Sequence, residues 1–372
     1  MTKAPKLTPL ADRLPSTVPF VGPEAQERAR GAGFTARLGA NENGFGPSEK
    51  AVAAMQAAAG EVWKYADPEA HDLRQAIAAH HGVAPENVMP GEGIDGLLGL
   101  LVRLYVGEGD PVVTSAGAYP TFNYHVAGFG GALHTVPYRD DAEDPEALVA
   151  KARETGAKLI YFANPDNPMG SWHPADRVQA MIEALPEGTL LILDEAYIET
   201  APEGTAPPLD MANPQVIRMR TFSKAYGLAG ARVGYALGQA EVIAGFDKVR
   251  NHFGLNRIAQ AGAVAALADR AGLAERLSQI AAARDTIARI ARDHGMTPLP
   301  SATNFVTIDT GGDGALARAL VGALSQRGVF IRMPFVAPQD RCIRVSVGPD
   351  EELQALAHSL PEALAAARAA QG

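Results

Sequence analysis

Short apolar runs that end in polar residues recur through the middle of this chain and restrict the folds open to it. Leu190-Leu191-Ile192-Leu193 is followed directly by Asp194, and the apolar residues 159–163 are followed by a loop that begins at Asn164. Uninterrupted apolar runs of this length are typical of strands buried on both faces, as in a parallel sheet. Open parallel sheets bind their ligands at the carboxyl ends of the strands. The pattern therefore predicts an α/β fold with a ligand site at these strand ends.

Other strands and helices alternate with these two runs, which indicates a mainly parallel sheet with right-handed crossovers. We expect a helix to open at Asp67-Pro68-Glu69, with proline at its first position, and to run to about His80 before Gly82. Asp144-Pro145-Glu146 is expected to open another helix in the same way. The strands are predicted at residues 87–89, 111–114, 133–136, 159–163, 190–193, 216–221 and 232–237.

The pattern changes after about Asn256, where two long alanine-rich helices are predicted at 256–271 and 273–294. Strands at 303–308 and 329–332, the strand that carries Arg344 and a terminal helix follow, which indicates a smaller α+β domain. A chain of 372 residues is long enough for two domains. We therefore predict a large domain at 45–255, and a small domain formed by 1–44 together with 256–372.

One lysine stands out in the segment from Thr221 to Leu228, Thr-Phe-Ser-Lys-Ala-Tyr-Gly-Leu, with Arg232 eight positions beyond it. Lys224 lies among small and apolar residues, where partial desolvation lowers its pKa and makes the neutral amine available. A neutral amine beside anion-binding groups is what a Schiff base with a phosphorylated aldehyde requires. The alternative is a surface lysine in a glycine-rich loop.

The polar strand ends supply the other groups that pyridoxal 5'-phosphate needs. A carboxylate such as Asp194 keeps the pyridine nitrogen protonated, so that the ring can accept electrons. Hydrogen-bond donors stabilise the ring phenolate, and cationic or N–H groups hold the phosphate. Three consecutive predicted strands end in residues of these kinds, which favours a site for this cofactor over a surface loop.

In their order and spacing these motifs resemble the fold-type I pyridoxal-phosphate aminotransferases, and within them the histidinol-phosphate aminotransferase group. The resemblance runs from Asn41-Glu42-Asn43 to the segment 343–348, Ile-Arg-Val-Ser-Val-Gly. It implies a three-layer large domain with a mainly parallel sheet, and a smaller α+β domain. It also implies pyridoxal 5'-phosphate as the cofactor and transamination as the reaction.

The resemblance gives roles to the residues at the matching positions. Lys224 matches the lysine that bonds to the cofactor and then moves a proton, and Asp194 matches the partner of the pyridine nitrogen. Asn167 and Tyr197 match the two phenolate ligands. Ser223 and Arg232 match phosphate ligands, and Arg344 matches the arginine that clamps the substrate carboxylate, a role suited to a guanidinium fork.

Two aromatic positions are carried over from the same resemblance. Tyr65, in Tyr65-Ala66-Asp67-Pro68, matches the tyrosine that reaches across a homodimer to the neighbour's cofactor phosphate, so that a monomer would have an incomplete site. Tyr119 matches the ring that stacks on the pyridine, with Phe122 as the alternative. A single aromatic side chain is more often part of a hydrophobic core.

The segment from Gly91 to Gly96 is a literal G-x-G-x-x-G between a predicted strand and an apolar helix at 97–105. It matches the context of a dinucleotide-binding loop, and a nicotinamide dehydrogenase is therefore an alternative. Backbone N–H groups at a helix N-terminus attract phosphate of either ligand. We interpret the segment as the phosphate-binding turn for pyridoxal phosphate, with Gly93, Ile94 and Asp95 near the anion. The family usually has Ser-Asp-Glu at 94–96, so a hydroxyl ligand is missing.

The substrate is the least constrained part of the prediction. Histidinol phosphate has no α-carboxylate, and the resemblance places Arg344 against its phosphate, with Arg332 as a second cation unless it forms only a surface salt bridge. The loop that carries Asn43 is expected to border the substrate, and its Gly44-Phe45 departs from the family's Pro-x-Gly pattern. The predicted reaction passes the amino group to a keto acid such as 2-oxoglutarate. The alternatives are an aromatic or broad-specificity aminotransferase and, more distantly, a decarboxylase or lyase on the same fold.

Composition excludes several other classes of protein. The net charge of −9, without a basic tract, argues against nucleic acid or an anionic membrane as a partner. No apolar run is long enough to span a bilayer, and the first 23 residues lack the apolar core of a signal peptide. The one cysteine, Cys342, suits a cytoplasmic protein. The scattered histidines predict no metal site.

Overall fold

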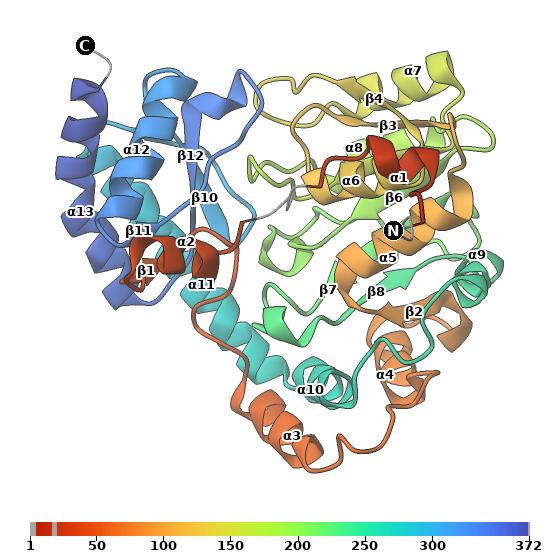
Figure 1. Cartoon of the computed structure of the whole chain (residues 1–372). Helices are drawn as coiled ribbons and strands as arrows, with labels where there is room; N and C mark the ends of the chain where they lie inside the picture. Colours follow the sequence, from red (N-terminus) through yellow and green to blue (C-terminus); the bar gives the residue numbers. More distant parts are fainter. Residues whose placement is uncertain (1–4, 17–20, 371–372) are drawn as a thin grey trace.

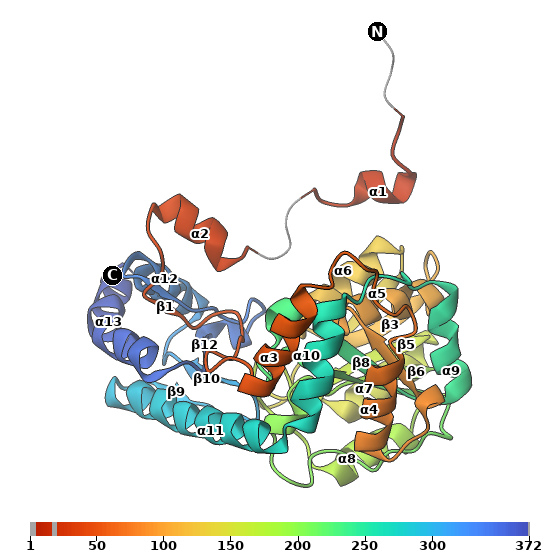
Figure 2. The same cartoon turned by 90° about the horizontal axis from the view of Figure 1, so that it is seen from below.

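The computed structural model describes residues 5–16 and 21–370 and has a large and a small domain (Figure 1). Three clusters of buried apolar side chains form the core of the large domain, and one forms the core of the small domain. The residues at 1–4, 17–20 and 371–372, which the sequence assigns to the small domain, lie outside the described part. The division at residue 255 remains a prediction. The helix α10 (Arg257–Ala268) lies beside α3 (Glu49–Ala59) and α4 (His71–His81) of the large domain (Figure 2). Its buried side chains belong to the same hydrophobic cluster as those of α3 and α4, which favours a boundary after residue 268.

The large domain is built on a seven-stranded sheet of order β2-β8-β7-β6-β5-β3-β4. Of the seven strands only β8 runs in the opposite direction to the other six, so the prediction of a mainly parallel sheet is confirmed. The strands are β2 (Val88–Gly91), β3 (Pro111–Ser115), β4 (Ala132–Val136), β5 (Leu159–Ala163), β6 (Leu190–Asp194), β7 (Val216–Thr221) and β8 (Gly234–Leu237).

Helices cover both faces of this sheet, because successive strand residues point to opposite faces and both sets are apolar. Tyr161 of β5 packs on one face with α5, whereas Phe162 packs on the other face with α7 and α8. The predicted three-layer arrangement is therefore confirmed. The helices of this domain, besides α3, α4 and α10, are α5 (Gly93–Tyr105), α6 (Pro120–Gly128), α7 (Pro145–Thr155), α8 (Ala175–Glu183) and α9 (Ala240–Ala244).

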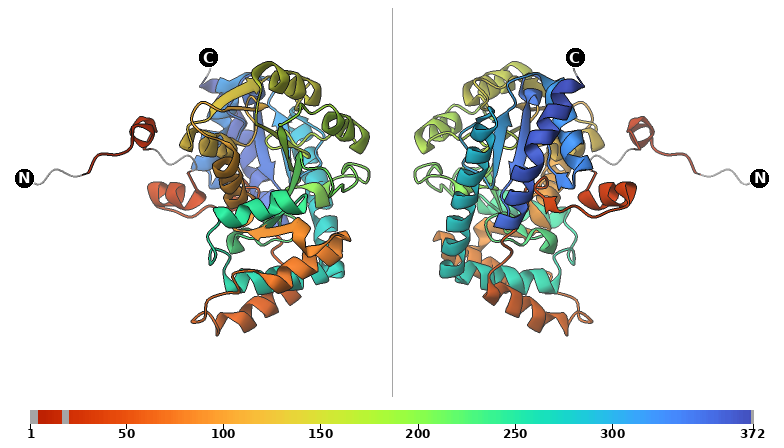
Figure 3. Two further views of the ribbon diagram at one scale, coloured as in Figure 1. Left: turned by 90° about the vertical axis from the view of Figure 1, so that its right-hand side faces the viewer. Right: turned by 90° about the vertical axis from the view of Figure 1, so that its left-hand side faces the viewer.

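The small domain is α+β, as predicted. In one sheet β10 pairs antiparallel with β12 and β9, and in another β1 pairs parallel with β11. The strands are β1 (Ala36–Arg37), β9 (Thr297–Pro298), β10 (Phe305–Asp309), β11 (Val329–Phe330) and β12 (Cys342–Ser346), and the helices are α11 (Arg270–Asp293), α12 (Gly314–Gln326) and α13 (Asp350–Ala369). Near the N-terminus, α1 (Pro9–Arg13) and α2 (Pro23–Arg30) project from the body of the molecule (Figure 3).

Several predicted boundaries are wrong: the helix expected at 97–105 begins already at Gly93, and the strand expected from residue 303 begins at Phe305. Two further boundaries are wrong for local reasons. The helix expected at Asp67-Pro68-Glu69 begins only at His71, because the Asp67 carboxylate accepts hydrogen bonds from the N–H groups of Glu69 and His71 and Ala70 has a φ of +47°. The strand expected from Arg232 begins at Gly234, because Arg232 has a φ of +56°. By contrast, Asp144 caps α7 and Pro145 is its first residue, as predicted.

Candidate active site

Lys224 follows the carboxyl end of β7, in the middle of the seven-stranded sheet. Its Nζ donates a hydrogen bond to the Asn41 carbonyl at 2.9 Å and lies 5.5 Å from the centre of the Tyr197 ring. Burial, together with the positive charges of Arg344 and Arg232, lowers the pKa of Lys224 to about 8. At neutral pH an appreciable fraction of this lysine is therefore the nucleophilic free amine.

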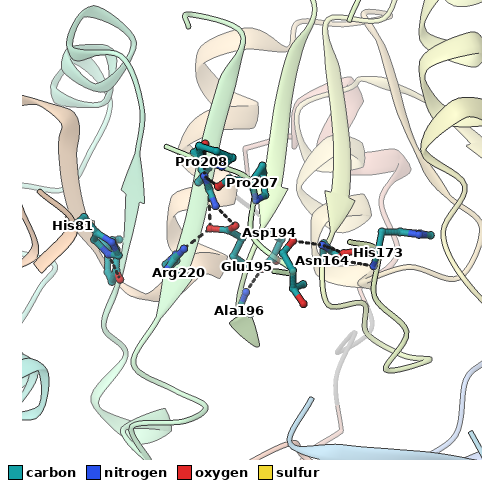
Figure 4. Close-up of polar contacts among 12 residues, drawn as sticks. His81, Asn164, His173, Asp194, Glu195, Ala196, Pro207, Pro208 and Arg220 are labelled. Carbon is teal, nitrogen blue, oxygen red and sulfur yellow. Dashed lines mark hydrogen bonds and ion pairs between the residues drawn. The ribbon is translucent and has the colours of Figure 1, made fainter. Parts of the chain in front are cut away.

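Asp194 ends β6, the strand next to β7, so that its carboxylate lies at the same edge of the sheet as Lys224. Its Oδ2 accepts a hydrogen bond from the Tyr161 hydroxyl at 2.7 Å. Its Oδ1 accepts one from the N–H of Ala196 at 2.9 Å (Figure 4). Burial raises the pKa of Asp194 to about 6, against which these hydrogen bonds and the charge of Lys224 act. A cation placed beside this carboxylate would hold it ionised.

Asn41 completes the group around Lys224 and was not selected from the sequence. Its Nδ2 donates to the Tyr197 hydroxyl at 3.0 Å, and its Oδ1 accepts from the Ser346 hydroxyl at 3.2 Å. The residue is buried and has a φ of +53°, a conformation in which asparagine is enriched. The segment Asn41-Glu42-Asn43 was conspicuous in the sequence, but nothing local distinguishes the role of the first asparagine from that of the second.

The predicted phosphate side lies at the N-terminus of α5. Gly93 is the first residue of this helix and has a φ of +76°, and a Cβ there would lie 2.4 Å from Nη2 of Arg232. Arg232 in turn donates to the Ser223 hydroxyl at 3.2 Å. Free helical N–H groups, a guanidinium and a hydroxyl therefore converge, which is a suitable environment for an anion.

The next two residues of the predicted turn point elsewhere. Ile94 packs into the core of the large domain, so only its backbone is available to a ligand. The Asp95 carboxylate lies 2.9 Å from Nε2 of His125. Both residues can therefore contribute N–H groups at the helix N-terminus, while the Asp95 carboxylate is hydrogen-bonded to a side chain of α6.

Of the two aromatic candidates, Tyr119 lies at the site. It directly precedes α6. Burial raises its pKa, the nearby charges of Asp95 and Asp194 raise it as well, and the charge of Arg232 lowers it. Phe122 is fully buried and stacks on Tyr161, with ring centres 4.8 Å apart. Phe122 thus belongs to the core, and the alternative assignment to it has no support in the geometry.

Asn167 and Arg344 meet across the two domains. Nη1 of Arg344, on β12, donates to Oδ1 of Asn167 at 2.5 Å, and its guanidinium lies 5.3 Å from the centre of the Phe305 ring. Arg332 is paired with Arg344 in an antiparallel bridge, which places the two side chains on the same face. Burial and the neighbouring charge of Arg344 lower the pKa of Arg332 to about 10. Arg332 also donates to the carbonyl of Val21 at 2.6 Å.

Two predicted residues stand apart from this group. The Asn43 amide donates to the Ala225 carbonyl at 3.1 Å and accepts from the Phe45 N–H at 3.2 Å, so it holds the backbone next to Lys224. Its contact with substrate remains a prediction. Tyr65 is 78% exposed and lies against Phe253, with ring centres 4.7 Å apart.

A buried ion cluster beside Asp194 was also missed by the sequence interpretation. Glu195 accepts hydrogen bonds from Nε of Arg218 at 3.0 Å and from Nε of Arg220 at 2.9 Å, both on β7 (Figure 4). Both arginines lower the pKa of Glu195 against the effect of its burial. The cluster links the end of β6 to β7, the strand that leads to Lys224.

The described residues contain no group of three or more His, Cys, Asp or Glu that could hold a metal ion.

The fold and the site define an aminotransferase. The profile of the family "Aminotransferase class I and II" matches residues 36–360, and the chain belongs to this family. Histidinol-phosphate aminotransferase from Anaeromyxobacter sp. strain Fw109-5 is 36% identical over 92% of this chain and 95% of its own length. Histidinol-phosphate aminotransferase 2 from Ralstonia nicotianae is 35% identical over 95% of this chain and 96% of its own length.

Solved structures give the same result. The crystal structure of histidinol-phosphate aminotransferase from Sinorhizobium meliloti in complex with pyridoxal 5'-phosphate is 58% identical, with a TM-score of 0.95, and the match covers 98% of this chain and 99% of that one. A putative histidinol-phosphate aminotransferase from Erwinia carotovora atroseptica is 27% identical, with a TM-score of 0.80, over 88% of this chain and 95% of that one. These similarities cover both domains.

Proposed function

We propose that this chain is a pyridoxal-phosphate-dependent histidinol-phosphate aminotransferase, which passes the amino group to a keto acid such as 2-oxoglutarate. The observation that carries the proposal is the placement of Arg332 directly across from Arg344 beside the Lys224 site. Like charges opposite each other in a strand pair are destabilising. Two such cations are an unfavourable arrangement that a dianionic substrate phosphate would relieve.

The residues present fit the cofactor. The cradle formed by Gly93 and Arg232 has room only for glycine, and it presents a guanidinium, the Ser223 hydroxyl and helical N–H groups to a phosphate. We assign Asp194 to the pyridine nitrogen, Tyr119 to the face of the ring, and Asn167 and Tyr197 to its phenolate oxygen. Lys224 is assigned to the aldehyde carbon. Bound there, the cofactor would supply an electron-accepting ring that stabilises negative charge on the substrate α-carbon.

The chain's own residues then perform the binding and the proton transfer. Arg344 and Arg332 would hold the substrate phosphate, which fixes the distance from that anion to the amino group. Lys224, as a free amine with its pKa lowered to about 8, can take the proton from the substrate α-carbon and would return it to the carbon of the cofactor's aldehyde group. The Asn41 carbonyl gives the ammonium form of Lys224 a hydrogen-bond acceptor between these transfers.

We further propose a homodimer in which Tyr65 reaches the phosphate in the neighbouring subunit. Tyr65 is too exposed to belong to a core, and Val62, Trp63 and Phe253 on the same surface are also exposed. An exposed group of large apolar side chains of this kind marks an interaction surface. Arg257 fixes the position of this loop by donating to the Tyr65 carbonyl at 2.6 Å.

A cytoplasmic location is also proposed, on the basis of the single buried cysteine, Cys342, which suits a reducing compartment. None of the helices in the described part of the chain is both long and apolar enough to cross a membrane.

The test is a set of half-reactions, in each of which a single amino donor is added to the purified holoenzyme. The visible absorbance of the holoenzyme monitors each half-reaction. Histidinol phosphate is expected to react fastest among histidinol phosphate, phenylalanine, tyrosine, aspartate and glutamate. Histidinol, which lacks the phosphate, is the matched control and should react at least about 100-fold less efficiently, because each charge-assisted hydrogen bond to the phosphate contributes about 1.5–3 kcal/mol. A faster reaction with phenylalanine or tyrosine would instead establish an aromatic aminotransferase.

A further inference from the structure

Two acidic side chains are buried together under the loop that carries Asn167, and nothing in the reaction described above uses them. Asp166 directly precedes Asn167 in the loop after β5, and Glu143 lies just before the N-cap of α7. Each of the two residues is only 1% exposed. Burying two carboxylates side by side is costly unless they share a proton and their remaining oxygens are hydrogen-bonded.

The hydrogen bonds indicate which of the two holds the proton. The Asp166 carboxylate acts only as a hydrogen-bond acceptor. Its Oδ1 accepts a hydrogen bond from the Tyr138 hydroxyl at 2.8 Å, and its Oδ2 accepts one from the N–H of Met169 at 3.0 Å. The N–H of Asn167 is a further donor to it. Burial raises the pKa of Asp166 to about 6, and these donors act against that rise, so the carboxylate is mostly ionised at neutral pH. A side-chain hydrogen bond joins it to Glu143, and between two carboxyl groups such a bond requires a proton.

Glu143 has the environment of the neutral partner. Its Oε1 accepts from the N–H of Ala163 at 2.9 Å, and its Oε2 accepts from the Ser115 hydroxyl at 2.6 Å. Its burial beside the Asp166 charge raises its pKa well above the ordinary value. His173 faces the Glu143 main-chain carbonyl, at 2.7 Å, and not the carboxyl group.

We propose that Asp166, ionised and hydrogen-bonded by protonated Glu143, is a positioning residue for Asn167 and Arg344. The Asp166 carboxylate accepts from the backbone on both sides of the loop, at residues 167 and 169, and so fixes the loop segment from which the Asn167 amide projects. The same amide accepts from Arg344. The Asp166 charge also favours the charged form of Arg344, whose pKa burial lowers.

This inference rests on the proposed function for the roles of Asn167 and Arg344, but the location of the proton is independent of it. E143Q keeps a donor toward Asp166, because the amide N–H₂ replaces the carboxyl O–H and the Ser115 hydroxyl can turn to accept. D166N removes the acceptor and brings an N–H₂ group toward the donors already there. If the proton were on Asp166 instead, the two substitutions would exchange their effects.

The experiment compares wild type, E143Q, D166N and, as a control, Y138F, which removes one donor to Asp166 and leaves both carboxyl groups in place. Infrared difference spectra of the cofactor-free proteins at neutral pH report the protonated carboxyl directly. We expect the carboxylic-acid C=O band assigned to the pair to be lost in E143Q and retained in Y138F. Retention of the full band in E143Q overturns the assignment, even if D166N fails to fold.

The positioning role is read on the holoenzyme in two ways. D166N is expected to lower kcat/KM for histidinol phosphate by about 10- to 100-fold, the effect of losing a charged hydrogen-bond acceptor, whereas E143Q stays within about 5-fold of wild type. D166N should also shift the pH midpoint of the bound cofactor's visible absorbance, a readout that needs no substrate. An unchanged midpoint in D166N, or equal effects of the two substitutions, would overturn the role. Failure of wild type to use histidinol phosphate would affect only the proposed function.

Discussion

The side chain of Lys224 is hydrogen-bonded to the main-chain carbonyl of Asn41, with 2.9 Å between Nζ and O, although 183 positions separate the two residues in the sequence. The same carbonyl accepts a hydrogen bond from Nδ2 of Asn304 at 3.0 Å. Asn41 has a φ of +53°, in the left-handed region. A loop near the N-terminus thus joins the lysine after β7 to the small domain. The backbone carbonyl of Asn41 supplies the hydrogen-bond acceptor of the Lys224 side chain.

The first prediction concerns this conformation. N41G keeps access to positive φ but loses the side-chain hydrogen bonds to Tyr197 and Ser346. N41A loses the same bonds and in addition must adopt a left-handed conformation, which costs about 1–2 kcal/mol. We therefore expect N41A to unfold at a lower urea concentration than N41G, by about 1 kcal/mol in the free energy of unfolding. Equal stabilities of the two variants would contradict the role given to the backbone of Asn41.

The second prediction is a pH dependence of stability that originates in Lys224. Its pKa is about 8 in the folded protein and has an ordinary value of 10.5. Between these two values the unfolded chain binds more protons than the folded one, so this group makes the free energy of unfolding rise with pH across that window. Below pH 8 the buried ammonium group of Lys224 destabilises the folded state by its full amount, and above about pH 10.5 this destabilisation is absent.

K224M isolates this effect, since methionine fills a similar volume without the charge. The cofactor-free variant should be more stable than the cofactor-free wild type at pH 7, and the difference should shrink steadily as pH rises through the interval from about 8 to 10.5. Urea unfolding at a series of pH values measures it. A difference that is independent of pH would mean that Lys224 is not desolvated in the folded state.

The strands that carry the site could be predicted from the sequence, whereas several of its residues could not. The run from Leu190 to Leu193 is apolar at every position, and this local pattern was sufficient to place Asp194 at a strand end. Glu195, Asp166 and Asn41 are equally buried, but their roles depend on partners from distant segments, such as Arg218 for Glu195. A local pattern contains no information about such pairings.

Errors at element boundaries have the same origin. The sequence leads from Arg232 directly into the apolar run of β8, but the Arg232 side chain donates to the Ser223 hydroxyl and the strand begins two residues later. A local pattern likewise favoured proline at the first helical position near Asp67, where a side-chain-capped turn forms instead. In both places a polar side chain bonds to a nearby group and overrides the propensity of the chain.

The third prediction separates the effect of Asp194 on the stability of the protein from its effect on activity. Its pKa of about 6 in the folded protein exceeds the ordinary 3.8, so the ionised carboxylate destabilises the cofactor-free fold at neutral pH. The stability that this group contributes in its protonated form is present below pH 3.8 and is lost as pH rises through about 6. D194N keeps an acceptor, and the Tyr161 hydroxyl can turn to accept from the new amide.

We expect cofactor-free D194N to be more stable than wild type at pH 7, by up to about 3 kcal/mol, with the advantage decreasing toward pH 4. Holoenzyme turnover should fall by about 10²- to 10³-fold, the usual effect of removing one preorganised electrostatic group. Thermal unfolding and steady-state transamination measure the two effects. A variant that is both less stable and less active would show that the Asp194 charge is not penalised by burial.

The fourth prediction tests whether Tyr65 acts in the neighbouring subunit. Tyr65 is exposed on its own chain, and its loop is fixed by Arg257. If the active site is shared, a Y65A subunit spoils its partner's site and a K224A subunit spoils its own. A mixed dimer then contains one wholly wild-type site, made of Lys224 from the Y65A subunit and Tyr65 from the K224A subunit. Equal amounts of the two variants, unfolded and refolded together, should yield about one quarter of the wild-type number of intact sites.

Each variant refolded alone is the control and should show much less activity than the mixture. A mixture that is no more active than the average of the two controls would place Tyr65 in its own subunit's site or outside any site.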